Sequence, residues 1–183
     1  MRSIVVHEVG PRDGLQMEKA VVPTAKKLEW IRSLAAAGVD IVQVGSFVHP
    51  EKVPQMADTD ELFRTLAREP HGRTTLSALA LNEKGLERAA ACDVGMLCLG
   101  VSASETHSRK NTGMGSEEAQ RRIVATARAA AAAGMKVQVS VQSAFGCGFE
   151  GAVPEARVLA IVAAYLEAAL ANVSLADTAG HAH

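Results

Sequence analysis

The feature that most constrains this chain is a regular alternation of short apolar runs with longer segments of helical periodicity. Six such runs predict strands, and a helical segment follows each of the first five. Parallel strands need a crossover connection, which a helix commonly supplies. The pattern therefore predicts an α/β fold with a parallel sheet. The runs are residues 4–6, 39–45, 74–80, 94–100, 135–141 and 172–177.

The predicted helices begin at residues that favour helix starts. Asp58, with Glu61 three residues later, resembles a capping box, and Asn82 and Ser116 are expected N-caps. Residues 102–115 are expected to form a long polar loop between a strand and a helix. The first run, residues 4–6, is expected to be a buried strand. The predicted helices cover residues 24–37, 58–69, 82–91, 116–133 and 154–170.

A sheet of this kind can stay open and doubly wound, or it can close into a TIM-type (β/α)8 barrel. No glycine-rich nucleotide fingerprint follows the first run, which disfavours the open sheet. Polar residues instead follow several different strands, which is typical of a barrel site. On this interpretation about six of the eight βα units are present. These polar residues are Arg12, Asp13, Gln43, Ser46 and Asp177.

Length and composition bound the function. The 183 residues fit a single domain, residues 1–183, and the net charge of -1 gives no basic field for nucleic acid. No apolar stretch of about 18 residues predicts a membrane span. The first strand begins by residue 4, which leaves no room for a targeting peptide, so a cytoplasmic location is expected. Cys92, Cys98 and Cys147 have no CxxC spacing and predict free thiols.

The first run breaks at Gly10-Pro11 and is followed at once by Arg12 and Asp13. Two interpretations stay open from the spacing alone. The pair can be a surface ion pair in a turn, or it can present chemistry at the carboxyl end of the strand. His7, in the same predicted strand, is expected to be a hydrogen-bonded histidine of the core or its rim.

Several loop motifs resemble those of the 3-hydroxy-3-methylglutaryl-CoA (HMG-CoA) lyases. An Arg-Asp-Gly-x-Gln motif alone would also fit the isopropylmalate and homocitrate synthases. The Val-Pro-Gln-Met-Ala-Asp sequence at residues 53–58 points to the lyase branch. The matching segments occur in the family's order over essentially the whole chain, at residues 10–19, 46–58, 110–111, 145–151 and 174–178.

The resemblance implies a barrel that cleaves HMG-CoA, or a close hydroxyacyl-CoA, into acetyl-CoA and a ketoacid with Mg²⁺ or Mn²⁺. It implies that Asp13 binds the metal, that Arg12 faces the acyl carbonyl and that Asp177 handles the hydroxyl proton. By the same matching, the acyl-CoA substrate is bound by Arg12, Gln16, Lys19, Ser46 and Ser174.

The sequence departs from the family pattern in two places. Gln43 stands where the family has a catalytic glutamate, and an amide cannot act as a base, which indicates a different acyl substrate or a weaker lyase. The family's later His-x-His metal pair and its catalytic cysteine have no match. The terminal His181-Ala182-His183 has a suitable spacing but aligns with the loop after the sixth strand.

Two other functions stay open. One is a Claisen-type synthase or aldolase on the same scaffold, and the other is a non-catalytic barrel fragment. A six-unit barrel would leave its first and last strands as open apolar edges, so a homo-oligomer is expected.

Overall fold

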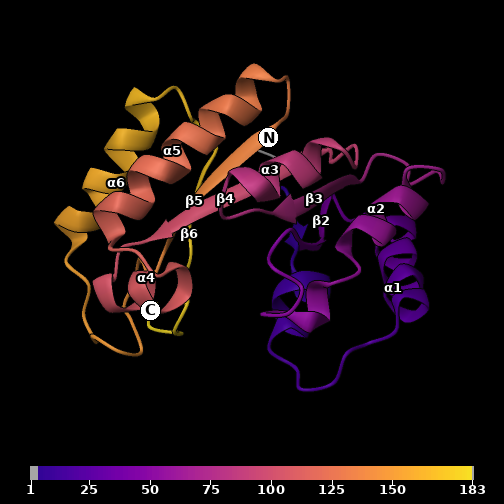
Figure 1. The fold of residues 1–183 in the computed structure, drawn as a ribbon, viewed down its shortest axis with the longest axis horizontal. Coiled ribbons are helices and arrows are strands. Elements are labelled where there is room, and N and C mark those ends of the chain that lie inside the picture. The colour runs from indigo at the N-terminus through magenta and orange to yellow at the C-terminus, as the bar shows by residue number, and fades with distance from the viewer. Residues whose placement is uncertain (1–3, 183) are drawn as a thin grey trace. The chain divides into compact units, whose positions relative to one another are not determined.

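The computed structural model describes residues 4–182, which form an α/β fold (Figure 1). The six strands follow one another in sequence order, β1-β2-β3-β4-β5-β6. The pairs β1–β2, β2–β3 and β5–β6 are parallel. The chain divides into two compact units with a boundary between Leu97 and Cys98, inside strand β4 (Met96–Ser102). The predicted alternation of strands and helices is confirmed.

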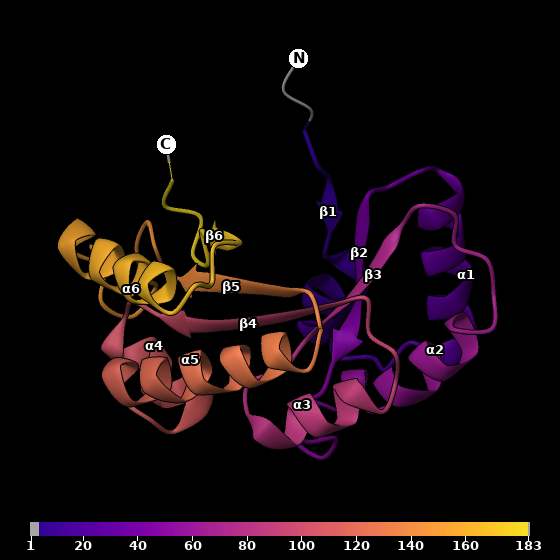
Figure 2. The same cartoon turned by 90° about the horizontal axis from the view of Figure 1, so that it is seen from above.

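In the first unit, helices α1 and α2 pack against β2 and against each other (Figure 2). The side chains of Ile31, Val42 and Leu62 are almost completely buried between these elements. The elements are β1 (His7–Glu8), the π-helical turn η1 (Gly10–Gly14), α1 (Thr24–Ala36), β2 (Ile41–Ser46), the 3-10 turn η2 (Pro54–Met56), α2 (Thr59–Leu66), β3 (Thr75–Leu79) and α3 (Glu83–Ala90).

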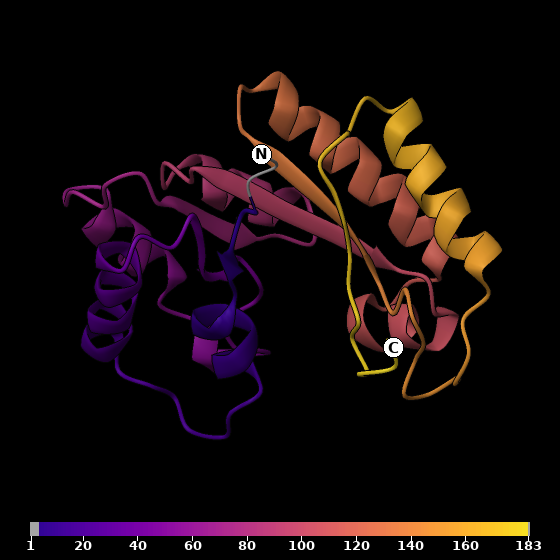
Figure 3. The same ribbon diagram turned by 180° about the vertical axis from the view of Figure 1, so that it is seen from behind.

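In the second unit, helices α5 and α6 both pack against β5 (Figure 3). Tyr165 on α6 is fully buried, and its hydroxyl donates a hydrogen bond of 3.1 Å to the Ser140 carbonyl. Burial therefore raises the pKa of this phenol. After β4, the elements are α4 (Glu105–Thr112), α5 (Ser116–Ala132), β5 (Val137–Gln142), α6 (Glu155–Glu167) and β6 (Val173–Leu175).

The expectation of a buried strand over residues 4–6 is wrong. The strand is His7–Glu8, and the exposed fractions of Ile4, Val5 and Val6 are 89%, 61% and 53%. The apolar side chains of residues 4–6 favour burial, but a side chain is buried only where a neighbouring element covers it. Strand β1 pairs with β2 at the end of the strand order, and nothing in the described part of the chain covers these three side chains.

The expectation of a loop over residues 102–115 is also wrong, because this segment contains α4 (Glu105–Thr112). The helix has almost no apolar residues, so hydrophobic periodicity cannot signal it. It is stabilised at its ends instead. The Ser104 hydroxyl accepts a hydrogen bond of 3.1 Å from the His107 N–H, and Gly113 takes the left-handed conformation that ends many helices, with φ of 77°.

The expected helix caps have different outcomes. Asn82 caps α3, because its side-chain oxygen accepts a hydrogen bond of 3.0 Å from the Gly85 N–H. Ser116 is instead the first residue of α5, and Gly115 takes the N-cap position. Asp58 stands at the N-cap of α2, but its side chain makes no capping bond because its carboxylate is engaged elsewhere.

That carboxylate pairs with a buried charge on α1. Lys27 is only 1% exposed, and its Nζ donates to Asp58 Oδ1 at 2.7 Å and to the Gln55 carbonyl at 2.6 Å. The Thr24 hydroxyl donates to Asp58 Oδ2 at 2.9 Å. A buried ammonium group is tolerated only with close partners of this kind. The interaction fastens the segment between β2 and α2 onto α1.

We expect Lys27→Met to lower the free energy of unfolding by about 3 kcal/mol, since it leaves a poorly exposed carboxylate without its cation. The matched control is Lys26→Met, which removes an ion pair with Glu29 whose side chains are 46% and 60% exposed. This control should cost less than about 0.5 kcal/mol. Urea unfolding at neutral pH measures both values, and equal losses would contradict the importance of the buried pair.

Candidate active site

Turn η1 places Arg12 and Asp13 directly after β1. The Val9 carbonyl accepts hydrogen bonds from the N–H groups of both residues, at 3.0 Å from Arg12 and 2.7 Å from Asp13. Pro11 fits the start of this turn because it has no N–H group to satisfy there. The chain therefore reverses as the strand ends, and the two polar side chains lie at its carboxyl end.

Arg12 brings three of the predicted site residues together. Its Nε donates to Gln43 Oε1 at 2.6 Å, and its Nη1 donates to Asp13 Oδ1 at 2.7 Å. The side chain of Arg12 is 16% exposed, whereas that of Asp13 is 62% exposed. Gln43 is buried in β2. The guanidinium is therefore held in one orientation between a buried amide and an accessible carboxylate.

The backbone of Ser46, at the end of β2, is fixed by hydrogen bonds to the side chain of Thr59. The Thr59 hydroxyl accepts from the Ser46 N–H at 3.2 Å and lies 3.1 Å from the Ser46 carbonyl and 2.8 Å from the Met56 carbonyl. This close approach requires glycine at position 45, because a Cβ there would lie 2.5 Å from Thr59 Oγ1. The β2–β3 register also shifts between Gln43 and Gly45.

Two predicted substrate-binding atoms are buried and have no hydrogen-bond partner among the described residues, Gln16 Oε1 and Ser46 Oγ. Buried polar atoms in proteins almost always have a partner. Both atoms can accept a hydrogen bond, and the Ser46 hydroxyl can also donate one. These two side chains therefore have unused bonding capacity that a polar ligand would satisfy.

Lys19 lies exposed between η1 and α1. The backbone beside it is fixed, because Gln55 Nε2 donates a hydrogen bond of 2.6 Å to the Glu18 carbonyl. The segment after β1 is thereby attached to the segment after β2. The substrate-binding role of Lys19 stays a prediction.

Arg88 on α3 supports the segment after β2, and sequence reasoning missed it. Its Nη1 donates to the Val48 carbonyl at 2.9 Å, and its guanidinium lies 5.3 Å from the centre of the Phe47 ring. It also pairs with Asp60 through two nitrogens. Burial raises the pKa of Asp60, but the hydrogen bond and charge of Arg88 outweigh it and hold that pKa below its usual value.

The second unit holds the other two predicted residues, Ser174 on β6 and Asp177 just after it. Ser174 is the register partner of Ser140 on β5. Asp177 is exposed, and its two carboxylate oxygens accept hydrogen bonds from the His181 N–H at 2.8 Å and the Ala182 N–H at 3.0 Å. Hydrogen bonds from Ala182 and His181 lower the pKa of this carboxyl.

The terminal histidines do not form a described metal pair, because His183 lies outside the described residues. The His181 ring lies against the backbone of Gly146, where a Cβ would come within 2.1 Å of its Nδ1. Within residues 4–182, no group of three or more His, Cys, Asp or Glu side chains is placed to hold a metal ion. The assignment of a metal to Asp13 stays a prediction.

The three cysteines are free, as the sequence predicts, and the structure shows that all three are buried. Cys147 lies in the glycine-rich segment after β5, and its Sγ accepts a hydrogen bond of 3.4 Å from the Phe149 N–H. Burial raises the pKa of this thiol, but hydrogen bonds from Ser104 and from the Phe149 and Glu150 backbone lower it by more. The structure confirms Cys147 as a packed thiol.

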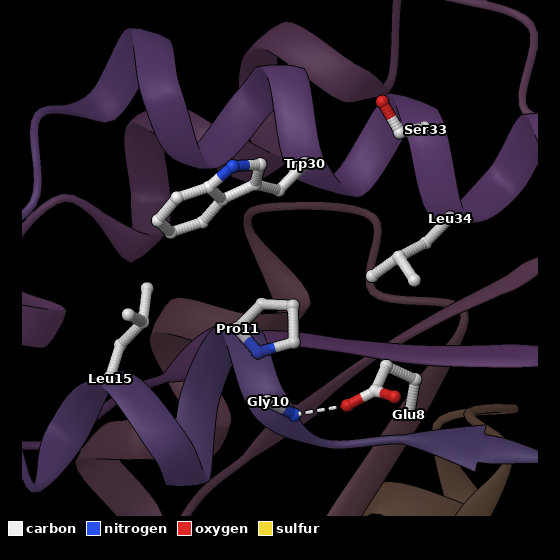
Figure 4. A pocket seen from close by; sticks show the side chains of 7 residues that line it. All are labelled: Glu8, Gly10, Pro11, Leu15, Trp30, Ser33 and Leu34. Atoms are coloured by element: carbon white, nitrogen blue, oxygen red, sulfur yellow. Dashed lines mark hydrogen bonds between the residues drawn. The ribbon is translucent and has the colours of Figure 1, made fainter.

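The other side of η1 borders an apolar pocket of about 450 Å³ (Figure 4). Glu8 is its one charged lining residue, and the carboxylate accepts a hydrogen bond of 2.6 Å from the Gly10 N–H. The pocket contains none of the predicted site residues. Turn η1 therefore contributes Gly10 and Pro11 to the apolar pocket, whereas Arg12 does not line it. The remaining lining residues are Gly10, Pro11, Leu15, Trp30, Ser33 and Leu34.

A family model described as HMGL-like matches residues 3–183. The chain belongs to the HMGL-like family. It is 34% identical over 182 residues to the hydroxymethylglutaryl-CoA lyase YngG of Bacillus subtilis, covering 100% of this chain and 60% of that protein. It is 36% identical over 179 residues to the mitochondrial hydroxymethylglutaryl-CoA lyase of Rattus norvegicus, covering 98% of this chain and 54% of the relative.

The family's structures support the fold. An HMG-CoA lyase from Acinetobacter baumannii, solved in complex with coenzyme A and 3-methylmalate, superposes with a TM-score of 0.91 at 35% identity. The match covers 98% of this chain and 58% of that one. The prediction of six βα units of a TIM-type barrel is thereby confirmed. The chain of this HMGL-like protein spans 54–60% of the length of these curated relatives.

None of the helices in the described part of this HMGL-like chain combines the length and apolar character that crossing a membrane requires.

We expect the two hydrogen bonds to Asp177 to be lost as the pH falls through the pKa of that carboxyl in the folded protein. Because this pKa is lowered from its ordinary value of 3.8, the turn is stabilised above that pH and weakens below it. The amide signals of His181 and Ala182 in NMR spectra should therefore titrate together with a midpoint below 3.8.

Asp177→Asn should abolish this shared titration, and Glu167→Gln on α6 should leave it unchanged. A midpoint at or above the ordinary carboxyl pKa would contradict the hydrogen bonds described for Asp177.

Proposed function

We propose that this protein is a carbon–carbon lyase that cleaves HMG-CoA, or a close 3-hydroxy-3-methylacyl-CoA, into acetyl-CoA and a ketoacid, acetoacetate for HMG-CoA itself. The observation that carries the proposal is the guanidinium of Arg12, held at the carboxyl end of β1 by Gln43 and Asp13. The Bacillus subtilis and Rattus norvegicus relatives, 34% and 36% identical to this chain, are named hydroxymethylglutaryl-CoA lyases.

The proposed reaction needs a fixed positive charge. When the bond between C2 and C3 of the acyl group breaks, negative charge develops on the thioester oxygen as an enolate forms. A cation that is already oriented stabilises that charge without rearranging, which makes such groups effective in catalysis. Arg12 meets this requirement, because hydrogen bonds of 2.6 Å and 2.7 Å fix both edges of its guanidinium.

A divalent cation, Mg²⁺ or Mn²⁺, fits the chemistry of Asp13. A carboxylate is the hard oxygen ligand that these ions prefer, and this one is 62% exposed and so accessible. Bound there, the ion would act as a Lewis acid on the oxygens of the substrate. Asp13 is the residue of the first unit that we propose as its ligand.

The substrate contacts follow from the unused bonding capacity of the first unit. We assign Gln16 and Ser46 to the polar atoms of the acyl group, because each has a buried oxygen without a partner among the described residues. The exposed ammonium of Lys19 suits the CoA phosphates or the acyl carboxylate. Coenzyme A in the Acinetobacter structure supports an acyl-CoA as the substrate class. Ser174 and Asp177 are proposed as further contacts, with Asp177 near the substrate hydroxyl.

We expect the protein to release acetyl-CoA and acetoacetate from HMG-CoA in the presence of Mg²⁺. Arg12→Gln should lower kcat about 100-fold, since it removes the charge that stabilises the enolate. Arg32→Gln removes an exposed arginine that pairs with Glu69, and it should leave kcat unchanged. A coupled assay of both products measures these rates. Synthesis of a hydroxyacyl-CoA from acetyl-CoA and a ketoacid, without cleavage, would instead indicate the Claisen-type alternative.

We expect Gln43→Glu to raise kcat more than it changes KM. The new carboxylate would replace an amide oxygen that lies 2.6 Å from Arg12 Nε, and groups at the reacting centre act mainly on the transition state. A new limb should also appear in the pH profile, because a titratable group has been added. Gln43→Leu is the matched control and should lower kcat. An unchanged rate and profile in Gln43→Glu would show that residue 43 only shapes the site.

A further inference from the structure

The hydrogen bonds of His7 determine which of its nitrogens carries a proton. His7 Nε2 lies 2.9 Å from the Ser77 hydroxyl, and that hydroxyl donates to the Val42 carbonyl at 3.3 Å. A carbonyl oxygen can only accept, so we assign the Ser77 proton to the contact with Val42 and His7 Nε2 as the donor to Ser77. The neutral imidazole then carries its proton on Nε2 and keeps a lone pair on Nδ1.

His7 projects from the same face of the first unit's sheet as Gln43. His7 is the register partner of Ile41, and Gln43 follows two residues later on β2. Side chains two residues apart in a strand lie on one face. Ser77 is in turn the register partner of Gln43. The imidazole therefore belongs to the same polar cluster as the amide that accepts from Arg12.

Burial, together with the charge of Arg12, favours the neutral form of this imidazole. Burial lowers the pKa of His7 below its ordinary value of 6.5, the positive charge of Arg12 lowers it further, and the charge of Glu8 raises it by less. The groups that face it from β2 and β3, Gln43 and Ser77, carry no charge. At neutral pH the side chain is partly exposed, uncharged and has an unprotonated nitrogen, which are the properties of a general base.

The proposed cleavage needs such a group, because the hydroxyl proton of the substrate must leave as the carbon–carbon bond breaks. Gln43 cannot take a proton. Asp177 is a weaker candidate, since both of its oxygens accept backbone hydrogen bonds that favour its ionised form. His7 is oriented by Ser77 and lies in the cluster that contains Arg12.

We propose that His7, oriented by Ser77, is the proton acceptor of this site, an inference that rests on the proposed lyase function. The proton of the substrate's 3-hydroxyl passes to Nδ1, and the C–O bond becomes the ketone of the ketoacid. The electron pair of the broken C2–C3 bond forms the thioester enolate. The enolate carbon then takes up one proton from water and the imidazolium of His7 releases one to water, which gives acetyl-CoA and returns His7 to its neutral form.

The first experiment measures the pH dependence of HMG-CoA cleavage. His7→Gln should lower kcat about 100-fold and remove the acid limb of the kcat profile, with little change in KM. The matched control is His71→Gln. His71 is also a hydrogen-bonded histidine of the first unit, 2.8 Å from the Thr74 carbonyl, but it lies in the segment that precedes β3. This control should keep both kcat and the acid limb.

The second experiment separates proton transfer from a structural role. Gln43→Glu should raise kcat by a larger factor in the His7→Gln background than in the wild type, because the new carboxylate supplies a base to the cluster that has lost the imidazole. A loss of packing would not be rescued in this way. Ser77→Ala keeps the imidazole and should lower kcat about fivefold. It tests the same inference if His7→Gln does not fold.

The third experiment observes His7 without any substrate. Nitrogen chemical shifts of the imidazole, from NMR spectra of the labelled wild-type protein at neutral pH, should show Nε2 protonated and Nδ1 unprotonated. Ser77→Ala should weaken this preference. A proton on Nδ1 would overturn the inference, because the nitrogen assigned as acceptor would already be occupied.

The outcomes also separate this inference from the proposed function. A wild-type protein that does not cleave HMG-CoA would overturn the function, and the role of His7 would fall with it. Cleavage by the wild type combined with an unchanged rate and acid limb in His7→Gln would overturn the role of His7 alone. Loss of the acid limb in Asp177→Asn, but not in His7→Gln, would assign the proton to Asp177.

Discussion

The buried ammonium of Lys27 is the interaction on which the candidate site of the first unit depends. It neutralises Asp58 and bonds to the Gln55 carbonyl, while the Gln55 side chain bonds to the Glu18 carbonyl. One charge on α1 thereby fixes the segments that follow β1 and β2. Apolar packing is non-directional and could not set the position of two polar segments so closely. The charged hydrogen bonds supply that direction.

Most of the fold could be predicted because it rests on local periodicity. The alternation of apolar runs and helical segments identifies the strands and most of the helices, and the Asn82 cap is local as well. The two failures in placing the elements themselves have a common physical origin. Helix α4 is held by Ser104 and Gly113 at its ends and has no apolar face to detect. Residues 4–6 are apolar, but their burial depends on which element lies beside them, which no local pattern records.

The candidate site was predictable where neighbours in sequence or successive strands bring residues together. Arg12 meets Asp13 because they are adjacent, and it meets Gln43 because β1 pairs with β2. The contacts that support these residues join positions far apart in the sequence. Arg88 reaches the Val48 carbonyl from 40 residues away, and His7 meets Ser77 across 70 residues. Contacts made by a long flexible side chain or a single hydroxyl group leave no periodic pattern in the sequence, so these two long-range hydrogen bonds could not be predicted.

The contact between Gly45 and Thr59 also constrains how this family can vary. A methyl group at position 45 would come within 2.5 Å of the Thr59 hydroxyl, which bonds to the backbone of Ser46. Replacing Gly45 first therefore creates a clash with Thr59. Replacing Thr59 by a smaller residue first removes the hydrogen bonds that its hydroxyl makes to the Ser46 backbone at the end of β2. Each single step is unfavourable on its own, so the two positions must change together. Among divergent descendants of this chain, the residues at 45 and 59 should be inherited as a matched pair.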